Sequence, residues 1–466
     1  MRQTRREGHE SAPSYGRSAA LLTVALATAG ALTYGFFAIS SHVLDREDYG
    51  RVVVLWSAIF ITVSVLFRPI EQLLTRTIAE RMAQGSPTSS TLRVAARIQI
   101  GVALAFVTVA LAARGPLESD LLDGSDLFFW ALIVSVLGYA ASYFARGYLA
   151  GNGRFGFYAV LLLLESVARL AFALALALGL ADGGDPVALG IAVAPALSLA
   201  VMPVAIRGGT PATPQVAIAR RPAQNLTGRE GVADFTLAEG TGFAGAILVI
   251  LLSEQVFLNS GPLLVGAEEG TAEAGFIFNV LMLARAPVVL FQAVATSLLP
   301  HLTRLRSRAD RSSHEEFSDS VRATILVIAC FATLTILVVA AAGPQLMQIA
   351  FGDTFTYDRT GLLIVAAGMG LYLTATTLSQ ATLAQAQARR AAICWGISAL
   401  AVGAWYLSAA VDIFRRIEIG FAGGAALLCV LLWAVYRRPL PRAEDVPEPG
   451  SPREAELRLT AADEAL

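Results

Sequence analysis

The segment that decides the fold is best seen at residues 45–72, which read DREDYGRVVVLWSAIFITVSVLFRPIEQ. A charged turn precedes an uncharged apolar run at residues 52–67, and an arginine-bearing stretch follows it. Further apolar runs, many near the roughly 20 residues that an α-helix needs to cross a bilayer, recur along the chain. The pattern predicts a helix that spans a membrane, repeated many times.

The composition supports this interpretation. Hydrophobic residues make up 55% of the 466-residue chain, charged residues 15%, and the mean hydropathy is +0.61. A typical soluble domain has roughly 25% charged residues, and a soluble protein this apolar could not cover its core with polar surface. We therefore expect an all-α polytopic membrane protein with about 12 transmembrane helices; the family resemblance given below implies that they form two six-helix bundles around a central cavity.

The predicted spans fall into two sets of six. They lie near residues 18–41, 52–67, 95–113, 127–149, 157–180, 187–206, 236–258, 274–299, 322–342, 359–384, 391–411 and 418–436. The N-terminal bundle would occupy residues 18–206 and the C-terminal bundle residues 236–436. Residues 1–17 would be an N-terminal tail, residues 207–235 a linker, and the Pro-rich, acidic residues 437–466 a disordered tail.

The arginines predict the orientation of the chain. All 35 basic residues are arginine, and with the N-terminus inside, 27 lie in inner segments and six in outer ones. Arg146, near the end of the fourth span, counts among the inner residues, and only Arg169 and Arg285 lie deep within spans. Cytoplasmic loops carry the excess of basic residues in membrane proteins. We expect a multi-pass protein of the bacterial plasma (inner) membrane with both termini and the linker in the cytoplasm.

The second and eighth spans indicate an internal repeat. Residues 48–52, DYGRV, and residues 273–277, EAGFI, each follow an acidic loop, and a Leu-Phe pair comes at the same depth in both spans. Two six-helix repeats with a site between them, near the bilayer midplane, are a common plan for secondary transporters.

Arg285 is the first candidate for a binding residue. It lies close to the middle of the eighth span, and Gln292 follows it by seven residues on the same stripe. A charge at this depth is costly and indicates a function. Arginine holds phosphate oxygens with a planar fork, so Arg285 could bind a phosphate or acidic sugar in a cavity. The alternative is a structural pair with a buried carboxylate such as Glu239 or Glu254.

Other charged residues form candidate pairs. Arg68 and Glu71, at the inner end of the second span, could form a cavity mouth or an interfacial pair that reaches toward water. Glu165 and Arg169 have the favourable i,i+4 order on a helix, which indicates a structural ion pair.

Two acids in the seventh span are candidates for ion coupling. Glu239 and Glu254 are fifteen residues apart and lie within about 60° of one face. Glu254 is deeper and is the better candidate to bind a proton or cation, while Glu239 could be interfacial. Asn259 and Asn279 are expected to form hydrogen bonds between helices.

Several chemistries are excluded by the motifs that the chain lacks. The sequence contains no GxxxxGK[ST] loop, no HExxH motif and no Cys or His cluster for a metal. The predicted outer loops are too short for the catalytic loop of a glycosyltransferase. We expect no cofactor, no metal, no nucleic-acid partner and no enzyme activity.

Six stretches together resemble a known family of transporters. They are residues 44–50, 68–81, 148–154, 285–291, 299–304 and 350–355. In order and spacing they are similar to polysaccharide flippases of the multidrug/oligosaccharidyl-lipid/polysaccharide (MOP) exporter superfamily, on the Wzx-like branch of O-antigen and teichoic-acid flippases. The resemblance implies a V-shaped pair of bundles and a cavity, often cationic, that the first, second, seventh and eighth helices line.

The resemblance also implies a substrate and partners. It points to an undecaprenyl-diphosphate-linked saccharide, moved by alternating access within the membrane lipids, with glycosyltransferases and a polysaccharide polymerase as further partners. Two alternatives remain from the sequence. One is a cation-coupled multidrug or metabolite exporter of the same superfamily, and the other is a non-transporting scaffold of an envelope-synthesis complex.

Overall fold

The computed structural model describes residues 12–207, 237–285 and 311–437, apart from residues 386 and 409. Within these ranges the chain is helical and has no strand. The elements are α1 (Ala12–Val43), α2 (Arg46–Leu66), α3 (Arg68–Ala83), α4 (Ser89–Ala112), α5 (Arg114–Pro116), η1 (Leu117–Leu121), α6 (Asp126–Gly151), α7 (Phe155–Ala177), α8 (Asp185–Ser198), η2 (Leu199–Val201), α9 (Met202–Arg207), α10 (Leu237–Glu268), α12 (Arg311–Phe351), α13 (Arg359–Ala384), α14 (Ala388–Tyr406) and α15 (Ile413–Tyr436). Residues 271–285 are also helical.

The chain is a multi-pass membrane protein. Ten helices of the described ranges are long and apolar enough to cross a bilayer. The predicted eleventh span coincides with α14, a helix of 19 residues that is not among those ten. The predicted eighth span is described only as far as residue 285. Four predicted features lie outside the described residues: Gln292, the Glu239 side chain, nearly all of the linker, and the C-terminal tail from residue 438.

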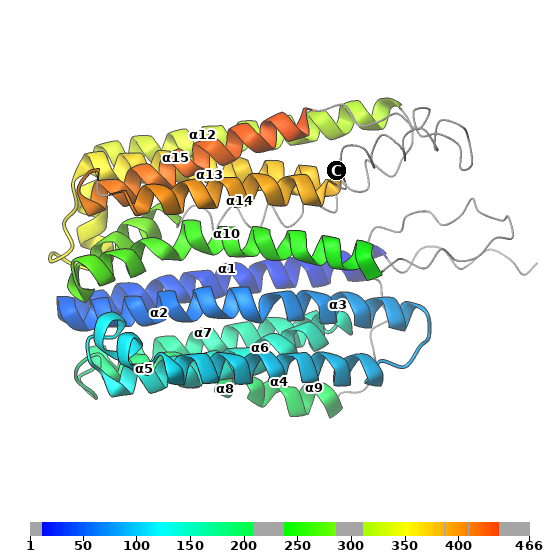
Figure 1. Ribbon diagram of the computed structural model, residues 1–466, viewed down its shortest axis with the longest axis horizontal. Helices are drawn as coiled ribbons and strands as arrows, with labels where there is room; N and C mark the ends of the chain where they lie inside the picture. The colour runs from blue at the N-terminus through cyan, green and yellow to red at the C-terminus, as the bar shows by residue number, and fades with distance from the viewer. Residues whose placement is uncertain (1–11, 208–236, 286–310, 386, 409, 438–466) are drawn as a thin grey trace, which may run out of the picture.

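The helices run side by side along the long axis of the molecule (Figure 1). In the first half of the chain α1 packs on α7, and α6 packs on α3 and α8; we call α1–α9 the N-terminal bundle. In the second half α13 packs on α12 and α15, and α10 packs on α14; we call the described residues 237–285 and 311–437 the C-terminal bundle. Between the bundles α2 packs on α10, and α1 makes a smaller contact with α12.

The second helix continues beyond its apolar run. The prediction ends this span at residue 67, and α2 does end at Leu66, but α3 begins at Arg68 and runs on to Ala83. Phe67 has φ −113° and ψ −25°, and Pro69 is in the first turn of α3. Proline has no N–H to donate to the preceding turn, so the long helix has a break beside Arg68. Arg68 and Glu71 therefore lie in the first turn of α3, directly after the break, and the helical stretch continues beyond them to Ala83.

One end of the molecule, at the left of Figure 1, is where the two bundles lock together; we call it the closed end. The Tyr49 hydroxyl donates a hydrogen bond to Asn279 Oδ1. The Phe355 ring lies 5.1 Å from the Tyr49 ring, between centroids. Arg46 and Glu273 form an ion pair at 3.3 Å. These contacts join residues that are more than 200 positions apart in the chain, so they fix the bundles to one another.

Two glycines at equivalent positions of the expected repeat lie in this contact. A Cβ on Gly50 would overlap the carbonyl of Thr271, and one on Gly275 would come within 2.9 Å of the Tyr49 ring. Each glycine therefore lets its helix approach the opposite bundle more closely than an alanine would. This is the close approach that small residues allow between membrane helices.

We expect Gly50→Ala to lower the thermal unfolding midpoint of the protein purified in detergent micelles. The added methyl has no room without separation of the bundles, and overpacking of this kind costs about 1–3 kcal/mol. Gly101→Ala is the matched control, because nothing lies within 4 Å of a Cβ there and both changes favour a helix equally. Equal midpoints for the two variants would show that the closed end does not depend on Gly50.

Candidate functional site

A group of charged side chains inside the helices connects the two bundles; we call it the charge network. Its members are Arg68, Glu71, Arg146, Glu165, Arg169, Glu254 and Arg285. They come from α3, α6, α7, α10 and the helix at residues 271–285. Charges inside a membrane protein are costly unless they are paired or face water, so the bonds of each member indicate its role.

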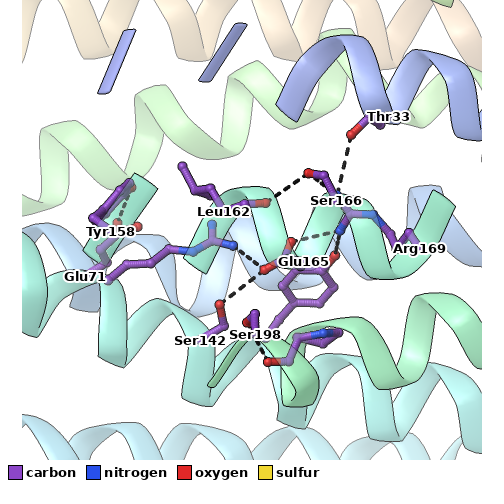
Figure 2. Close-up of polar contacts among 12 residues, drawn as sticks. Thr33, Glu71, Ser142, Tyr158, Leu162, Glu165, Ser166, Arg169 and Ser198 are labelled. Carbon is purple, nitrogen blue, oxygen red and sulfur yellow. Dashed lines mark hydrogen bonds and ion pairs between the residues drawn. The ribbon is translucent and has the colours of Figure 1, made fainter. Parts of the chain in front are cut away.

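Glu165 of α7 is held between two arginines. Its carboxylate accepts hydrogen bonds from Arg146 Nη2 at 2.5 Å and Arg169 Nη1 at 2.8 Å. Ser142 Oγ donates a third bond at 3.3 Å, and the Glu165 side chain is only 5% exposed (Figure 2). A carboxylate has about four sites that accept hydrogen bonds. Glu165 therefore has little capacity left for a proton or a cation.

Arg169 extends this cluster to the other helices of the N-terminal bundle. Its guanidinium donates to the Tyr139 hydroxyl of α6, to Ser166 Oγ at 3.2 Å and to Thr33 Oγ1 of α1 at 3.5 Å (Figure 2). It also lies 5.1 Å from the centre of the Trp56 ring on α2. The pair that the sequence predicts from Glu165 and Arg169 is thus part of a larger structural cluster.

Glu71 of α3 stands next to that cluster. Its Oε1 accepts a hydrogen bond from the Tyr158 hydroxyl at 3.0 Å (Figure 2). Arg146 and Arg68 are among its electrostatic neighbours. The sequence suggests a local pair of Glu71 with Arg68, but the bonds differ because the Arg68 side chain reaches the other bundle.

Arg68 and Glu254 form an ion pair between the bundles. Arg68 Nη1 lies 3.5 Å from Glu254 Oε2, and this is the one hydrogen bond between α3 and α10 among the described residues. The two side chains are 39% and 28% exposed. The distance exceeds the 2.7–2.9 Å that is usual for a charge-assisted hydrogen bond. The pair is therefore loose and accessible, in contrast to the cluster around Glu165.

Arg285 is the last described residue of its helix, about 21 Å along the axis from residue 271. Its Nε and Nη2 atoms are buried and have no hydrogen-bond partner among the described residues. Glu254 and Tyr372 of α13 are the groups that interact with it electrostatically. The sequence names Glu254 as a candidate partner, and the structure brings the two near each other without a hydrogen bond in the described part of the chain.

Sequence reasoning missed Arg146. It lies near the end of the predicted fourth span and was assigned to an inner segment, whereas its side chain is 9% exposed and bonded to Glu165. A signal is available in the sequence, because Tyr139, Ser142 and Arg146 form a polar stripe at helical spacing within an apolar run. Tyr158 and Tyr372 had no comparable signal.

Comparisons with known proteins identify the fold. No protein-family model matches the chain. Solved structures with similar folds include the MATE multidrug transporter DinF-BH in complex with R6G, with a TM-score of 0.61 and 14% identity over 94% of this chain and 100% of that one. A MATE transporter of Vibrio cholerae gives a TM-score of 0.59 and 18% identity, over 91% and 96% of the two chains. The chain has the fold of the MATE transporters.

Two further comparisons extend this result. A MOP-superfamily transporter of Pyrococcus furiosus, described as having a binding pocket of reverse polarity, gives a TM-score of 0.60 and 13% identity over 90% of this chain and 95% of that one. Uncharacterized proteins of two Mycobacterium tuberculosis strains are 26% identical over 435 residues, which cover 91% of this chain and 92% of theirs. The MATE fold therefore extends over nearly the whole chain.

The charge network gives this MATE fold an excess of positive charge. With its carboxylates ionised, the network holds four arginines against three glutamates, a net charge of +1. The described residues contain no group of three or more His, Cys, Asp or Glu that could hold a metal ion. The arrangement is suited to attract an anion, which would complete the pairing of the arginines.

We expect Glu165→Ala to destabilise the protein strongly. The change leaves Arg146 and Arg169 buried without their carboxylate, and loss of one partner from a buried pair costs about 3–5 kcal/mol. Glu80→Ala is the control, because Glu80 pairs with Arg76 on an accessible face of α3 and such pairs contribute at most about 1 kcal/mol. Denaturation of both variants in micelles measures the difference, and similar losses would contradict a structural role for Glu165.

Proposed function

We propose that the chain is a flippase that moves an undecaprenyl-diphosphate-linked saccharide across the bacterial plasma membrane for synthesis of a cell-surface polysaccharide. The observation that carries the proposal is the net positive charge network, together with the two buried Arg285 nitrogens that lack a partner among the described residues. A diphosphate offers several anionic oxygens, and the planar guanidinium binds such oxygens through paired hydrogen bonds. A head group of this kind would satisfy both features.

The proposed path begins at the loose ion pair between Arg68 and Glu254. The head group enters beside Arg68, whose side chain is 39% exposed, and Arg285 then holds the diphosphate. The closed end faces outward if the excess of arginine marks the cytoplasmic side, so this conformation is the one that faces inward. The bundles then rock until the closed end opens. A substrate drives that change only by binding the two states with different affinity, and an ion gradient or the membrane potential would assist.

The lipid tail would stay in the bilayer along the seam between the bundles. A groove of about 500 Å³ lies between the bundles at the closed end, lined by α1, α7 and α12. Ile39, Val43 and Ile349 are among the side chains that line it. Hydrocarbon is the favourable neighbour for such a surface, so an isoprenoid chain could lie there while the head group remains with the arginines.

A second candidate is a cation-coupled exporter of drugs or metabolites. The similarity of fold to multidrug transporters supports it. Such an exporter would need an acid in the N-terminal bundle that can bind a cation, and Glu165 is occupied by two arginines. Glu71 would then have to be the acid that binds the coupling cation. A scaffold for glycosyltransferases and a polymerase is the third candidate, and it has no need of a positively charged network.

We expect Arg285→Ala to abolish surface polysaccharide in the native host while the protein remains in the membrane. The lipid-linked precursor should then accumulate with its saccharide facing the cytoplasm, because the diphosphate has lost its main cation. Arg93→Ala is the control, since Arg93 is exposed on α4. The measurement is the amount of precursor accessible in each leaflet of inverted and intact vesicles.

The outcome separates the candidates. Normal flipping in a strain deleted for the gene would refute the flippase. Increased drug sensitivity of that strain, with normal polysaccharide, would favour the exporter. Loss of polysaccharide on deletion but not in Arg285→Ala would favour the scaffold.

A further inference from the structure

The three carboxylates of the charge network differ in how many hydrogen bonds they accept and in how exposed they are. Glu165 accepts three hydrogen bonds, two of them from arginines, and is 5% exposed. Glu71 accepts one hydrogen bond at 3.0 Å from Tyr158 of its own bundle. Glu254 has an ion-pair contact of 3.5 Å from Arg68 of the opposite bundle, lies beside the Tyr372 hydroxyl of its own bundle, and is 28% exposed. Glu254 is thus the carboxylate most easily separated from its partner in the described network.

Glu254 is also shared by the two arginines to which the proposed function assigns the substrate. It is the ion-pair partner of Arg68 and an electrostatic neighbour of Arg285. Tyr372 interacts with the same three groups. Without this carboxylate, Arg68 would lose its ion-pair partner and Arg285 the carboxylate that acts on it. Glu254 therefore balances charge at both arginines while no substrate is bound.

We propose that Glu254 is a resident counter-ion, which occupies the anion position at Arg68 and Arg285 and is displaced by the diphosphate of the substrate. This inference rests on the proposed function and adds to it a reason for the mixed charges of the site. Arg68 and Arg285 together carry two positive charges, and a diphosphate diester carries two negative ones. The charges of the arginines and the diphosphate balance only after the Glu254 carboxylate has moved away from the arginines.

The displacement also alters the contact between the bundles. The Arg68–Glu254 contact joins α3 to α10, so an anion that takes its place removes one link between the bundles at a distance from the closed end. Substrate binding and the release of this link are therefore one event. A loose contact suits that role, because accessible ion pairs contribute little stability.

The test measures the affinity of anionic probes for the full-length protein in lipid nanodiscs. The probes are farnesyl diphosphate, a short lipid diphosphate, and inorganic pyrophosphate, and farnesol is the uncharged control. The variants are Glu254→Gln, which removes the charge and keeps the shape, and Glu254→Ala, which also removes the amide. Glu80→Gln is the matched control, because it removes the same charge from an accessible position on α3 outside the network.

A resident counter-ion predicts that both Glu254 variants bind farnesyl diphosphate about three- to tenfold more tightly than the wild type, since a competing ion pair has been removed. Glu80→Gln should stay within about twofold of the wild type. Unchanged or weaker binding by both Glu254 variants, with wild-type binding intact, would overturn the counter-ion and leave the flippase in place. Failure of the wild type to bind either diphosphate would instead refute the proposed function.

The two probes distinguish the sources of the anion. A gain in affinity for both probes supports displacement by the diphosphate group, which they share. Tighter binding of farnesyl diphosphate than of pyrophosphate by the wild type supports a lipid-linked substrate over a soluble anion. A gain for farnesol would overturn the counter-ion, because an uncharged probe does not compete with a carboxylate.

Discussion

The bond between Glu165 and its two arginines is the interaction on which the rest of the site depends. A bilayer provides no water to solvate a guanidinium, so Arg146 and Arg169 can remain buried only because Glu165 forms an ion pair with each of them. This bond ties α6 to α7, and Arg169 adds links to α1 and to the Trp56 ring of α2. With the N-terminal bundle fixed in this way, Arg68 is left to pair with Glu254 of the other bundle. Arg285 of that bundle keeps two buried nitrogens without a partner among the described residues.

The spans could be predicted from the sequence because each depends on an apolar run that is local in the chain. The helix at α2 and α3 shows where that logic stops. The apolar run ends at Phe67, but the helical conformation resumes at Arg68 and continues through polar residues to Ala83. A run of apolar residues marks where lipid ends and carries no information on where a helix ends.

The pairing within the site could not be predicted, because its partners are far apart in the chain. Glu165 and Arg169 are four residues apart, and their pair can be read from helical spacing. Arg68 and Glu254 are separated by 186 positions, so only the packing of α3 near α10 brings them together. Arg146 shows a third situation. Its place near the end of an apolar run suggests an interfacial residue, and the packing of α6 on neighbouring helices turns it inward instead.

The break at Phe67 gives the long second helix the mechanics of a lever. The 16 residues of α3 extend about 24 Å beyond the break, so a bend of about 10° there would move the far tip by about 4 Å. Arg68 sits at the fulcrum and hardly shifts. A small change of angle at Phe67 would therefore become a large displacement at the far end of α3, while Arg68 keeps nearly the same position.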